Sequence, residues 1–454
     1  MTTGPRQEAD PLGTWSDPLD AGYATPSLPG VGGTIKQRHE DFLVEELPLY
    51  DPVGEGEHVY VLLEKRGMSS QEMVRVVAQH FGVREDDVGY AGMKDKHAVT
   101  RQVVSVHVPG KKPEDFPELR HDKVGVLWAD LHTNKLRLGH LRGNRFSIKV
   151  RGVEGLAAVR AKRVVDELVR VGVPNLFGPQ RFGYLNLNHE LGRLLLLNDF
   201  RGLVDLLLGP TAEDPATRET PASEQNRAAR AKYAEGDLDA AYQLLSAGLV
   251  TERAVLGRLV KGQDPEEAVR RVHPLQLKFW LSAFQSAVFN GLTASRLNAG
   301  ALGAFELGDV AIKLRNGALF DVDEETLGDP DLERRRAAFD VAPSGPIWGA
   351  RMKTAQHCVA RREHDALRAT GVTVDAIDGV GDELNVRVGG TRRAMVVPIG
   401  FPEVEGGTDE HGHYVRVAFE LPSGSFATVV MREIMKNRAP DVAAPGPADQ
   451  EDPA

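Results

Sequence analysis

The chain has 454 residues, 41% of them hydrophobic, and a formal net charge of −10. This size suits two or three domains with ordinary cores, and the acidic charge argues against indiscriminate nucleic-acid binding while leaving room for a local basic surface. No apolar run reaches the length of a membrane span, the N-terminal residues lack a secretory signal, and the single cysteine, Cys358, excludes an internal disulfide. We therefore expect a protein that works in the cytoplasm.

Both ends of the chain are predicted to be flexible tails. Residues 1–30 are rich in Pro, Gly, Thr and Ser, and residues 438–454 repeat that composition with added acidic side chains. Such segments bury too little apolar surface to fold. The folded part is expected to lie between these tails.

A strand and a capped helix begin the folded part. Residues 58–64 (HVYVLLE) predict a strand. Ser69 and Glu72 then form a capping-box pair that opens a helix over 71–81, and Gly82 ends this helix.

Further strand patterns surround two polar segments. The runs 88–93 and 102–108 flank a loop that contains Asp95. Residues 136–151 (LRLGHLRGNRFSIKVR) predict two strand pieces around a glycine-rich turn, and a helix is predicted over 156–171.

The second half of the chain has a different pattern. Residues 187–300 predict mostly helices around a polar loop at 210–226, and residues 301–398 are mixed and rich in glycine. The last predicted elements are a strand over 413–421 and a helix that ends near Lys436. We interpret the helical middle as an inserted domain whose two flanks belong to one mixed α and β core.

The stretch YAGMKDKHAVTRQ, residues 90–102, places one carboxylate, Asp95, between two lysines at the tip of a turn. An aspartate in a turn is common and usually has no chemical role. The residues of this stretch alone leave open both a solvated turn and a reactive carboxylate.

A basic segment follows the Asp95 loop. The run from Asn134 to Arg151 has no acidic residue and contains six positive side chains, namely Lys135, Arg137, Arg142, Arg145, Lys149 and Arg151. On an acidic protein such a concentration can contact phosphates, and it can equally be the solvated face of a strand. The pattern alone favours neither interpretation.

Motifs for other chemistries are missing or weak. His411 and His413 form a His-x-His pair without an obvious third ligand, which favours a surface turn over a metal site. The sequence contains no GxxxxGK loop, no GxSxG elbow and no HExxH helix. We expect no bound metal.

Six segments occur in an order that resembles the TruD family of tRNA pseudouridine synthases. They are IKQRHEDFLVEE (35–46), YAGMKDKHAVTRQ (90–102), LRLGHLRGNRFSIKVR (136–151), PNLFGPQRFG (174–183), LSAFQSAVFN (281–290) and LPSGSFATVVMREIMK (421–436). These segments span almost the whole chain apart from its tails. The KD and FGxQRFG segments are individually specific, and the match is weaker over 210–226 and 301–398.

The resemblance implies a fold and a domain plan. The fold is an α+β pseudouridine synthase core, a mainly antiparallel mixed sheet with helices in circularly permuted order, into which a family-specific α/β domain is inserted. The expected parts are a tail over 1–30, a discontinuous catalytic core of 31–174 plus 399–437, an inserted domain over 175–398 and a tail over 438–454.

The resemblance also implies an activity and its residues. The activity is the isomerisation of uridine to pseudouridine in tRNA, at uridine 13 of the D arm, and Asp95 matches the catalytic aspartate. The positions that match the substrate pocket are Phe42, Asn144, Phe146 and Phe426, with Lys36 at a basic position before the DF motif.

These residue types suit the reaction. It breaks an N-glycosidic bond and joins C1′ of the ribose to C5 of the same base, so it is redox-neutral and needs no cofactor. A carboxylate can attack the ribose or the base covalently, or take a proton from C2′, and the sequence favours neither route. Aromatic walls and an amide can hold the freed uracil while it turns.

We expect tRNA as the partner, no membrane contact, and a monomer, because no coiled-coil or repeated interface pattern occurs. The side chains expected to contact the RNA backbone are Lys94, Lys96, Arg142 and Arg145. The lysines beside Asp95 are also expected to favour its charged form. Two alternatives stay open, a non-catalytic RNA-binding module on the same scaffold and a synthase with a different RNA target.

Overall fold

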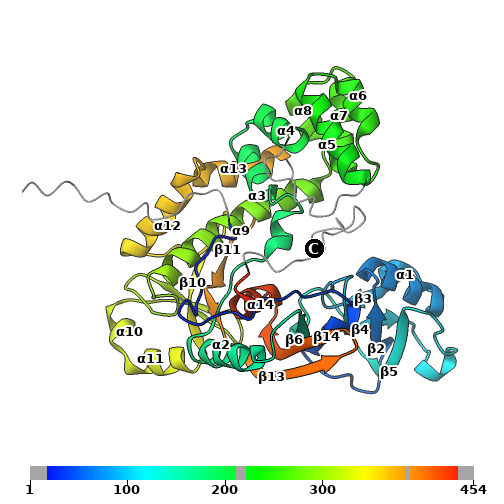
Figure 1. Ribbon diagram of the computed structural model, residues 1–454, viewed down its shortest axis with the longest axis vertical. Helices are drawn as coiled ribbons and strands as arrows, with labels where there is room; N and C mark the ends of the chain where they lie inside the picture. The colour runs from blue at the N-terminus through cyan, green and yellow to red at the C-terminus, as the bar shows by residue number, and fades with distance from the viewer. Residues whose placement is uncertain (1–17, 211–220, 385, 387, 438–454) are drawn as a thin grey trace, which may run out of the picture. The chain divides into compact units, whose positions relative to one another are not determined.

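A computed structural model of the chain describes residues 18–210, 221–384, 386 and 388–437 (Figure 1). Most of the tail predicted over 1–30, and all of the tail predicted over 438–454, lie outside the described residues.

The chain forms two compact units. The sheet unit comprises Ala24–Val173 together with residues 397–437, and the inserted unit comprises Pro174–Val396 together with the segment that ends at Tyr23. The sequence predicted changes of unit after residues 174 and 398, and the structure has them after Val173 and Val396.

The sheet unit is built on one sheet in the order β13-β14-β6-β1-β4-β2-β5, with β3 paired to β4. Among the described strands of this sheet, β1 and β4 pair in parallel and the other neighbouring strands pair antiparallel. The strands are β1 (Phe42–Pro48), β2 (His58–Arg66), β3 (Val88–Tyr90), β4 (Val99–His107), β5 (Val124–His132), β6 (Leu141–Arg151), β13 (Gly400–Asp409) and β14 (Gly412–Pro422).

The helices of the sheet unit are α1 (Ser70–Phe81), α2 (Ala157–Val171) and α14 (Ala427–Met435), with short 3-10 turns η1 (His39–Asp41), η2 (Glu85–Asp87) and η3 (Pro113–Asp115). The predicted capping box is confirmed, since Ser69 accepts from the N–H of Glu72 and the Glu72 carboxylate accepts from the N–H of Ser69. Gly82 ends α1 in the left-handed conformation at a φ of 66°, as a C-terminal glycine should.

One row of buried side chains crosses five strands of the sheet. The register sets Lys65 opposite Thr100, Thr100 opposite Val44, Val44 opposite Phe146 and Phe146 opposite Phe419. Residues that lie opposite one another in neighbouring strands share a face. The same face therefore carries polar groups on β2 and β4 and aromatic rings on β6 and β14.

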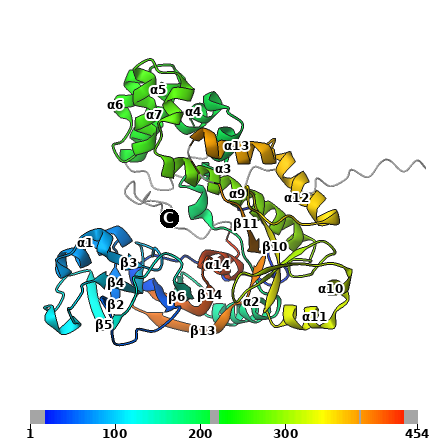
Figure 2. The same ribbon diagram turned by 180° about the vertical axis from the view of Figure 1, so that it is seen from behind.

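The inserted unit combines helices with a smaller antiparallel sheet in the order β11-β10-β8-β9. Helices α4 to α8 pack against one another as a bundle (Figure 2). The helices are α3 (Asn188–Leu196), α4 (Phe200–Leu208), α5 (Pro221–Ala234), α6 (Leu238–Leu244), α7 (Val250–Val260), α8 (Pro265–Arg270), α9 (Pro274–Asn298), α10 (Glu324–Gly328), α11 (Pro330–Ala337), α12 (His357–Ala369) and α13 (Val374–Leu384), with the 3-10 turn η4 (Pro179–Phe182). The strands are β8 (Val310–Lys313), β9 (Leu319–Asp321), β10 (Val341–Ile347) and β11 (Thr391–Ala394), and short strands β7 (Val173–Pro174) and β12 (Val396–Val397) mark the two crossings between units.

The secondary structure predicted for the second half, mostly helical before residue 300 and mixed after it, is confirmed by these elements. Among the described residues, none of the helices is long and apolar enough to cross a membrane.

Two predictions about elements are wrong. Residues 136–140 form no strand, because Leu136 donates to the hydroxyl of Ser105 and Gly139, at a φ of 90°, donates to the carbonyl of Ala91 instead of joining a ladder. The last residues of the loop predicted over 210–226 belong to a helix, because α5 begins at Pro221, and residues 211–220 lie outside the described residues.

The described part of the predicted N-terminal tail differs from a flexible segment. Thr25 is buried, and its hydroxyl donates at 3.0 Å to the carboxylate of Glu433 on α14, which also accepts from the N–H of Ala24 at 2.7 Å. These donors compensate a carboxylate that is itself 1% exposed. The composition of this stretch is polar, as in a flexible tail, but its polar groups form hydrogen bonds with the buried carboxylate of Glu433 and so hold it in place.

Candidate active site

The Asp95 loop (residues 91–98) and the segment before β1 lie next to each other where strands β4 and β1 begin. Strands β1 and β4 are the parallel pair, with Leu43 opposite Val99. Because parallel neighbours start at the same edge, the residues that precede them lie side by side. Lys36 precedes β1 and Asp95 precedes β4, so the sheet brings two segments far apart in sequence together.

Lys36 and Asp95 form an ion pair in which the Lys36 side chain is 2% exposed and that of Asp95 is 20% exposed. The Lys36 Nζ atom also lies 4.5 Å from the ring centroid of Phe42, a cation–π contact. The backbone of Lys36 has a φ of 59°, a left-handed conformation that a long side chain adopts only where its surroundings impose it. This strained turn directs the ammonium at Asp95.

The carboxylate of Asp95 is held in its charged form. Burial by itself raises the pKa of Asp95, but the Lys36 ammonium and the N–H of His97, which donates to Oδ1 at 3.1 Å, together hold that pKa below its ordinary value. The sequence predicted such an effect from the lysines that flank Asp95. The structure assigns it to Lys36, which lies far away in the sequence.

Lys94 does not lie on the surface. Its side chain, 4% exposed, is ion-paired with Glu46 of β1, which is 1% exposed. Burial raises the pKa of Glu46, and the Lys94 charge only partly offsets this. A buried ammonium held by a carboxylate is not free to bind phosphate, which argues against the predicted contact of Lys94 with the RNA backbone. Lys94 instead ties the Asp95 loop to β1.

A third lysine, which the sequence analysis missed, lies beneath the loop. Lys65 of β2 is 1% exposed, and its ammonium donates to the main-chain oxygens of Met68, Lys94 and Asp95. One signal was available, because Lys65 follows the buried Leu63 by two residues and so continues the inward-facing positions of the strand. A charged residue at an inward-facing position indicates a buried polar interaction.

Aromatic rings border the Lys36–Asp95 pair. Phe42 and Phe146 lie on neighbouring strands with ring centroids 6.4 Å apart and an edge-to-face angle of 70°. Phe146 and Phe419 follow at 5.6 Å. Since Lys36 sits over Phe42, these rings extend from the ion pair along one face of the sheet.

Asn144 lies on the same strand as Phe146 and on the same face, opposite Glu46 on β1 and Leu421 on β14. Its Oδ1 atom is buried and has no hydrogen-bond partner among the described residues. An acceptor without a partner at this place suits an N–H group of a ligand. Phe426, half-buried, is the N-cap residue of α14 just after the end of β14.

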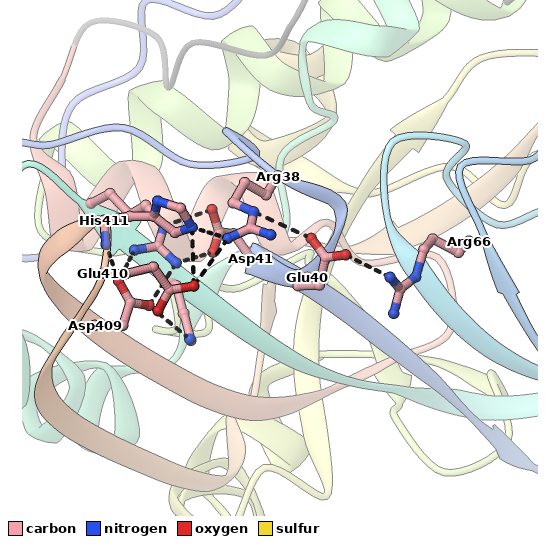
Figure 3. Close-up of polar contacts among 9 residues, drawn as sticks. Arg38, Glu40, Asp41, Arg66, Asp409, Glu410 and His411 are labelled. Atoms are coloured by element: carbon pink, nitrogen blue, oxygen red, sulfur yellow. Dashed lines mark hydrogen bonds and ion pairs between the residues drawn. The ribbon is translucent and has the colours of Figure 1, made fainter.

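The turn that carries Lys36 is anchored by a separate cluster. Arg151 of β6 donates to the two oxygens of Asp41 at 2.8 and 2.7 Å and to those of Asp409 at 2.8 and 2.9 Å. Asp41 ends η1, directly before β1, and Asp409 ends β13, so the tip of the β13–β14 hairpin is tied to this turn (Figure 3). We call Arg151, Asp41 and Asp409 the anchor cluster.

Exposed charges lie beside the anchor cluster. Figure 3 shows Glu40 between Arg66 and Arg38, with Arg38 also contacting His411 in the hairpin turn. The ion pairs of Glu40 measure 2.8 Å to Arg66 and 3.6 Å to Arg38. Exposed pairs of this kind contribute little to stability. In the part of the chain that the structure describes, no group of three His, Cys, Asp or Glu side chains could hold a metal ion.

Much of the basic segment is neutralised by acids of the neighbouring strands. Arg145 pairs with Glu403 of β13 at 2.7 Å and with Glu420 of β14 at 3.4 Å. Lys149 is paired with a carboxylate of the anchor cluster, to which Arg151 itself belongs. The tertiary pairing of β6, β14 and β13 therefore turns a basic sequence into a surface of mixed charge.

The other predicted contacts to RNA are more accessible. Arg142 is exposed at the start of β6, and Lys96 is half-buried within the Asp95 loop. Both lie in segments that the candidate site uses, and both stay predicted phosphate contacts.

Two more of the six segments that resemble the TruD family, residues 174–183 and 281–290, contact each other inside the inserted unit. The amide of Asn290 on α9 donates to the carbonyl of Phe177 at 3.0 Å and accepts from its N–H at 2.8 Å. Arg181 lies 5.2 Å from the centroid of the Phe177 ring and donates to Ser282 at 2.9 Å. These contacts give segments 174–183 and 281–290 a packing role.

Comparisons with known proteins identify the family of this chain. A family model described as TruD, tRNA pseudouridine synthase D, matches residues 19–434. A Geobacter metallireducens tRNA pseudouridine synthase D is 44% identical over 421 residues, covering 92% of this chain and 98% of the relative. The Geotalea daltonii protein of the same name is 41% identical over 416 residues, covering 91% and 99%.

A solved structure agrees with the fold as well. The crystal structure of a Methanosarcina mazei protein described as tRNA pseudouridine synthase D (TruD) matches with a TM-score of 0.75 at 26% identity, over 91% of this chain and 96% of that one. Together the comparisons define the class of the chain as a pseudouridine synthase. It belongs to the tRNA pseudouridine synthase D (TruD) family. The predicted family, α+β fold and enzyme class are confirmed, and the roles of the individual residues stay predictions.

Proposed function

We propose that this protein isomerises uridine to pseudouridine in tRNA and that Asp95 is its catalytic carboxylate. The observation that carries the proposal is the ion pair of the half-buried Asp95 with the buried Lys36 beside the ring of Phe42. The finer target, uridine 13 of the D arm, follows from the resemblance to the family. We place the activity in the cytoplasm and in a monomer without a cofactor.

The reaction requires a charged carboxylate at the reacting atoms. The N1–C1′ bond breaks and a C5–C1′ bond forms, while the proton lost from C5 is balanced by one gained at N1, so no electrons enter or leave. Asp95 can act as a nucleophile towards the ribose or the base, or as a base that removes the C2′ proton and returns it. Both routes need the ionised form, which the Lys36 ammonium favours.

The pocket must hold a free uracil and let it turn. Phe146 and Phe42 offer apolar rings that stack without competing for hydrogen bonds, and Phe426 stands at the start of α14 nearby in the sheet unit. The unsatisfied Oδ1 of Asn144 can accept the N3–H of the base. Flipping the nucleotide out of its stack costs a few kcal/mol, which these contacts offset.

Contacts with the RNA backbone require accessible cations. We assign this role to Arg142 and Lys96, and to Arg145 after exchange of its pairs with Glu403 and Glu420 for a phosphate. Lys94 is left out because its charge is buried against Glu46.

Two alternatives compete with this proposal. A non-catalytic RNA-binding module gains nothing from an ionised carboxylate in its pocket, because that charge repels a polyanion. The Lys36–Asp95 pair therefore favours the synthase. A synthase with another RNA target has the same fold, and the experiment below separates the two.

The test is pseudouridine-specific chemical mapping of unmodified tRNA after incubation with the wild-type protein or with Asp95→Asn. We expect a new pseudouridine at position 13 with the wild type alone. A product at another position would show that the target is a different uridine of tRNA. Binding of tRNA without product by both proteins would favour the binding module or a synthase that acts on a different RNA.

A further inference from the structure

Lys65 lies at the end of β2, beneath the loop that presents Asp95. Its Nζ atom donates to the carbonyl of Met68 at 2.5 Å, to that of Asp95 at 3.3 Å and to that of Lys94 at 3.4 Å. An ammonium has three donors, so these three oxygens use its full capacity. Two of the three belong to the Asp95 loop.

The charge of Lys65 is not explained by stability. Among the described residues no carboxylate lies within ion-pair distance of its ammonium, which is buried. The charged groups that face it are Asp95 and Lys94 on the loop and Glu72 on α1, and burial outweighs them and lowers the pKa of Lys65 to about 8. A buried ammonium without a paired carboxylate lowers the stability of a fold.

The two loop carbonyls that Lys65 holds flank the Cα atom of Asp95. The carbonyl of Lys94 precedes this Cα and that of Asp95 follows it, so fixing both oxygens fixes the backbone dihedrals from which the carboxylate projects. The N–H of Lys94 donates to the hydroxyl of Ser70 at 3.0 Å, which holds the preceding peptide of the loop as well. The direction of the carboxylate towards Lys36 depends on this support.

We propose that Lys65 is a positioning residue that grips the main chain of the Asp95 loop from below and holds the carboxylate in line with Lys36. The role rests on the proposed function, since it concerns the placement of the same carboxylate. Misplacement of a reacting group by about 1 Å can lower a rate by about 10²-fold. The loss should therefore appear in the chemical step and not in the binding of RNA.

The test compares Lys65→Met with the wild type in single-turnover pseudouridine formation, in tRNA binding and in thermal unfolding. Methionine keeps the length of the side chain and removes its charge and donors. We expect the rate constant to fall by about 30-fold to 100-fold, the dissociation constant to change by less than about two-fold, and the unfolding midpoint to stay or rise. Lys162→Met, which removes an exposed lysine of α2, is the matched control and should behave as wild type.

A conservative variant separates positioning from packing. Lys65→Arg keeps a charge and several donors, so it should recover part of the rate that Lys65→Met loses. A rate for Lys65→Met within about three-fold of wild type would overturn the proposal. So would a midpoint that falls together with the rate in both variants, or a Lys65→Met chain that does not fold, because either result assigns Lys65 to stability.

The same assay tests the proposed function separately. A wild-type protein that forms no pseudouridine in tRNA contradicts the proposed function and, with it, this role. A wild type that forms product while Lys65→Met forms it equally fast contradicts only the role of Lys65.

Discussion

Two clusters of buried charge lie in the sheet unit, and they are built differently. In the anchor cluster the guanidinium of Arg151 meets two carboxylates through four hydrogen bonds. In the cluster around Asp95, carboxylates are outnumbered by ammonium groups, and the members of this cluster are Asp95, Glu46, Lys36, Lys94 and Lys65.

The difference shows which cluster stabilises the fold. The anchor cluster satisfies its charges with good geometry, as a structural ion cluster must. The Asp95 cluster contains a lysine in a left-handed backbone conformation, an ammonium held only by carbonyls and, on the neighbouring strand, the unsatisfied oxygen of Asn144. Strain and unsatisfied groups are typical of sites that act on a ligand.

The largest expected effect comes from Asp95→Asn. Removing the charge while keeping the shape should lower pseudouridine formation by about 10³-fold or more and change tRNA affinity only a few-fold. Single-turnover rates and binding measured side by side check this, with Asp166→Asn on the exposed face of α2 as the control. A large loss of tRNA affinity would show that Asp95 is a structural residue. The two clusters would then not differ in role.

Asp41→Asn probes the anchor cluster in the same way. It leaves the Arg151 guanidinium with one carboxylate in place of two, and we expect the free energy of unfolding to fall by about 3 kcal/mol. Urea unfolding followed by circular dichroism measures this. If Asp41→Asn unfolds like the wild type, the anchor cluster is not structural.

Lys36→Met should act on the pH dependence of the rate. With Lys36 present the pKa of Asp95 lies below its ordinary value, so activity is retained as the pH falls towards that range. Without Lys36, burial raises the pKa of Asp95, and activity is lost at a higher pH; at neutral pH we expect a loss of about 10²-fold or less. A pH–rate profile whose acidic limb stays in place would show that Lys36 does not control this carboxylate.

The smallest effect is expected on the basic strand. Arg142→Ala should weaken tRNA binding and reduce the slope of log K against log salt by about 0.7 to 0.9, because the exposed guanidinium can contact a phosphate. Arg145→Ala should change the slope less, since Glu403 and Glu420 already neutralise that charge. Equal slopes for the two variants would mean that these ion pairs open on binding.

The sequence predicted the local features of the site well. The capping box of α1, the strands around the Asp95 loop and the alternation of Phe146 with basic residues follow from patterns of a few neighbouring positions. It did not reveal the burial of Lys94, because nothing near Lys94 in the sequence shows that Glu46 lies beside it. Nor did it reveal the ion pairs of Arg145, since the acids that pair with it come from β13 and β14.

By itself the sequence determined the family, the mixed fold and the segments that carry the candidate residues, because motifs and periodicity are local. The tertiary structure decided which of the charged residues meet. The parallel pairing of β1 with β4 places Lys36 on Asp95, and the burial of β2 places Lys65 beneath the loop. Contacts between distant segments depend on strand order and register, and these are properties of the folded sheet.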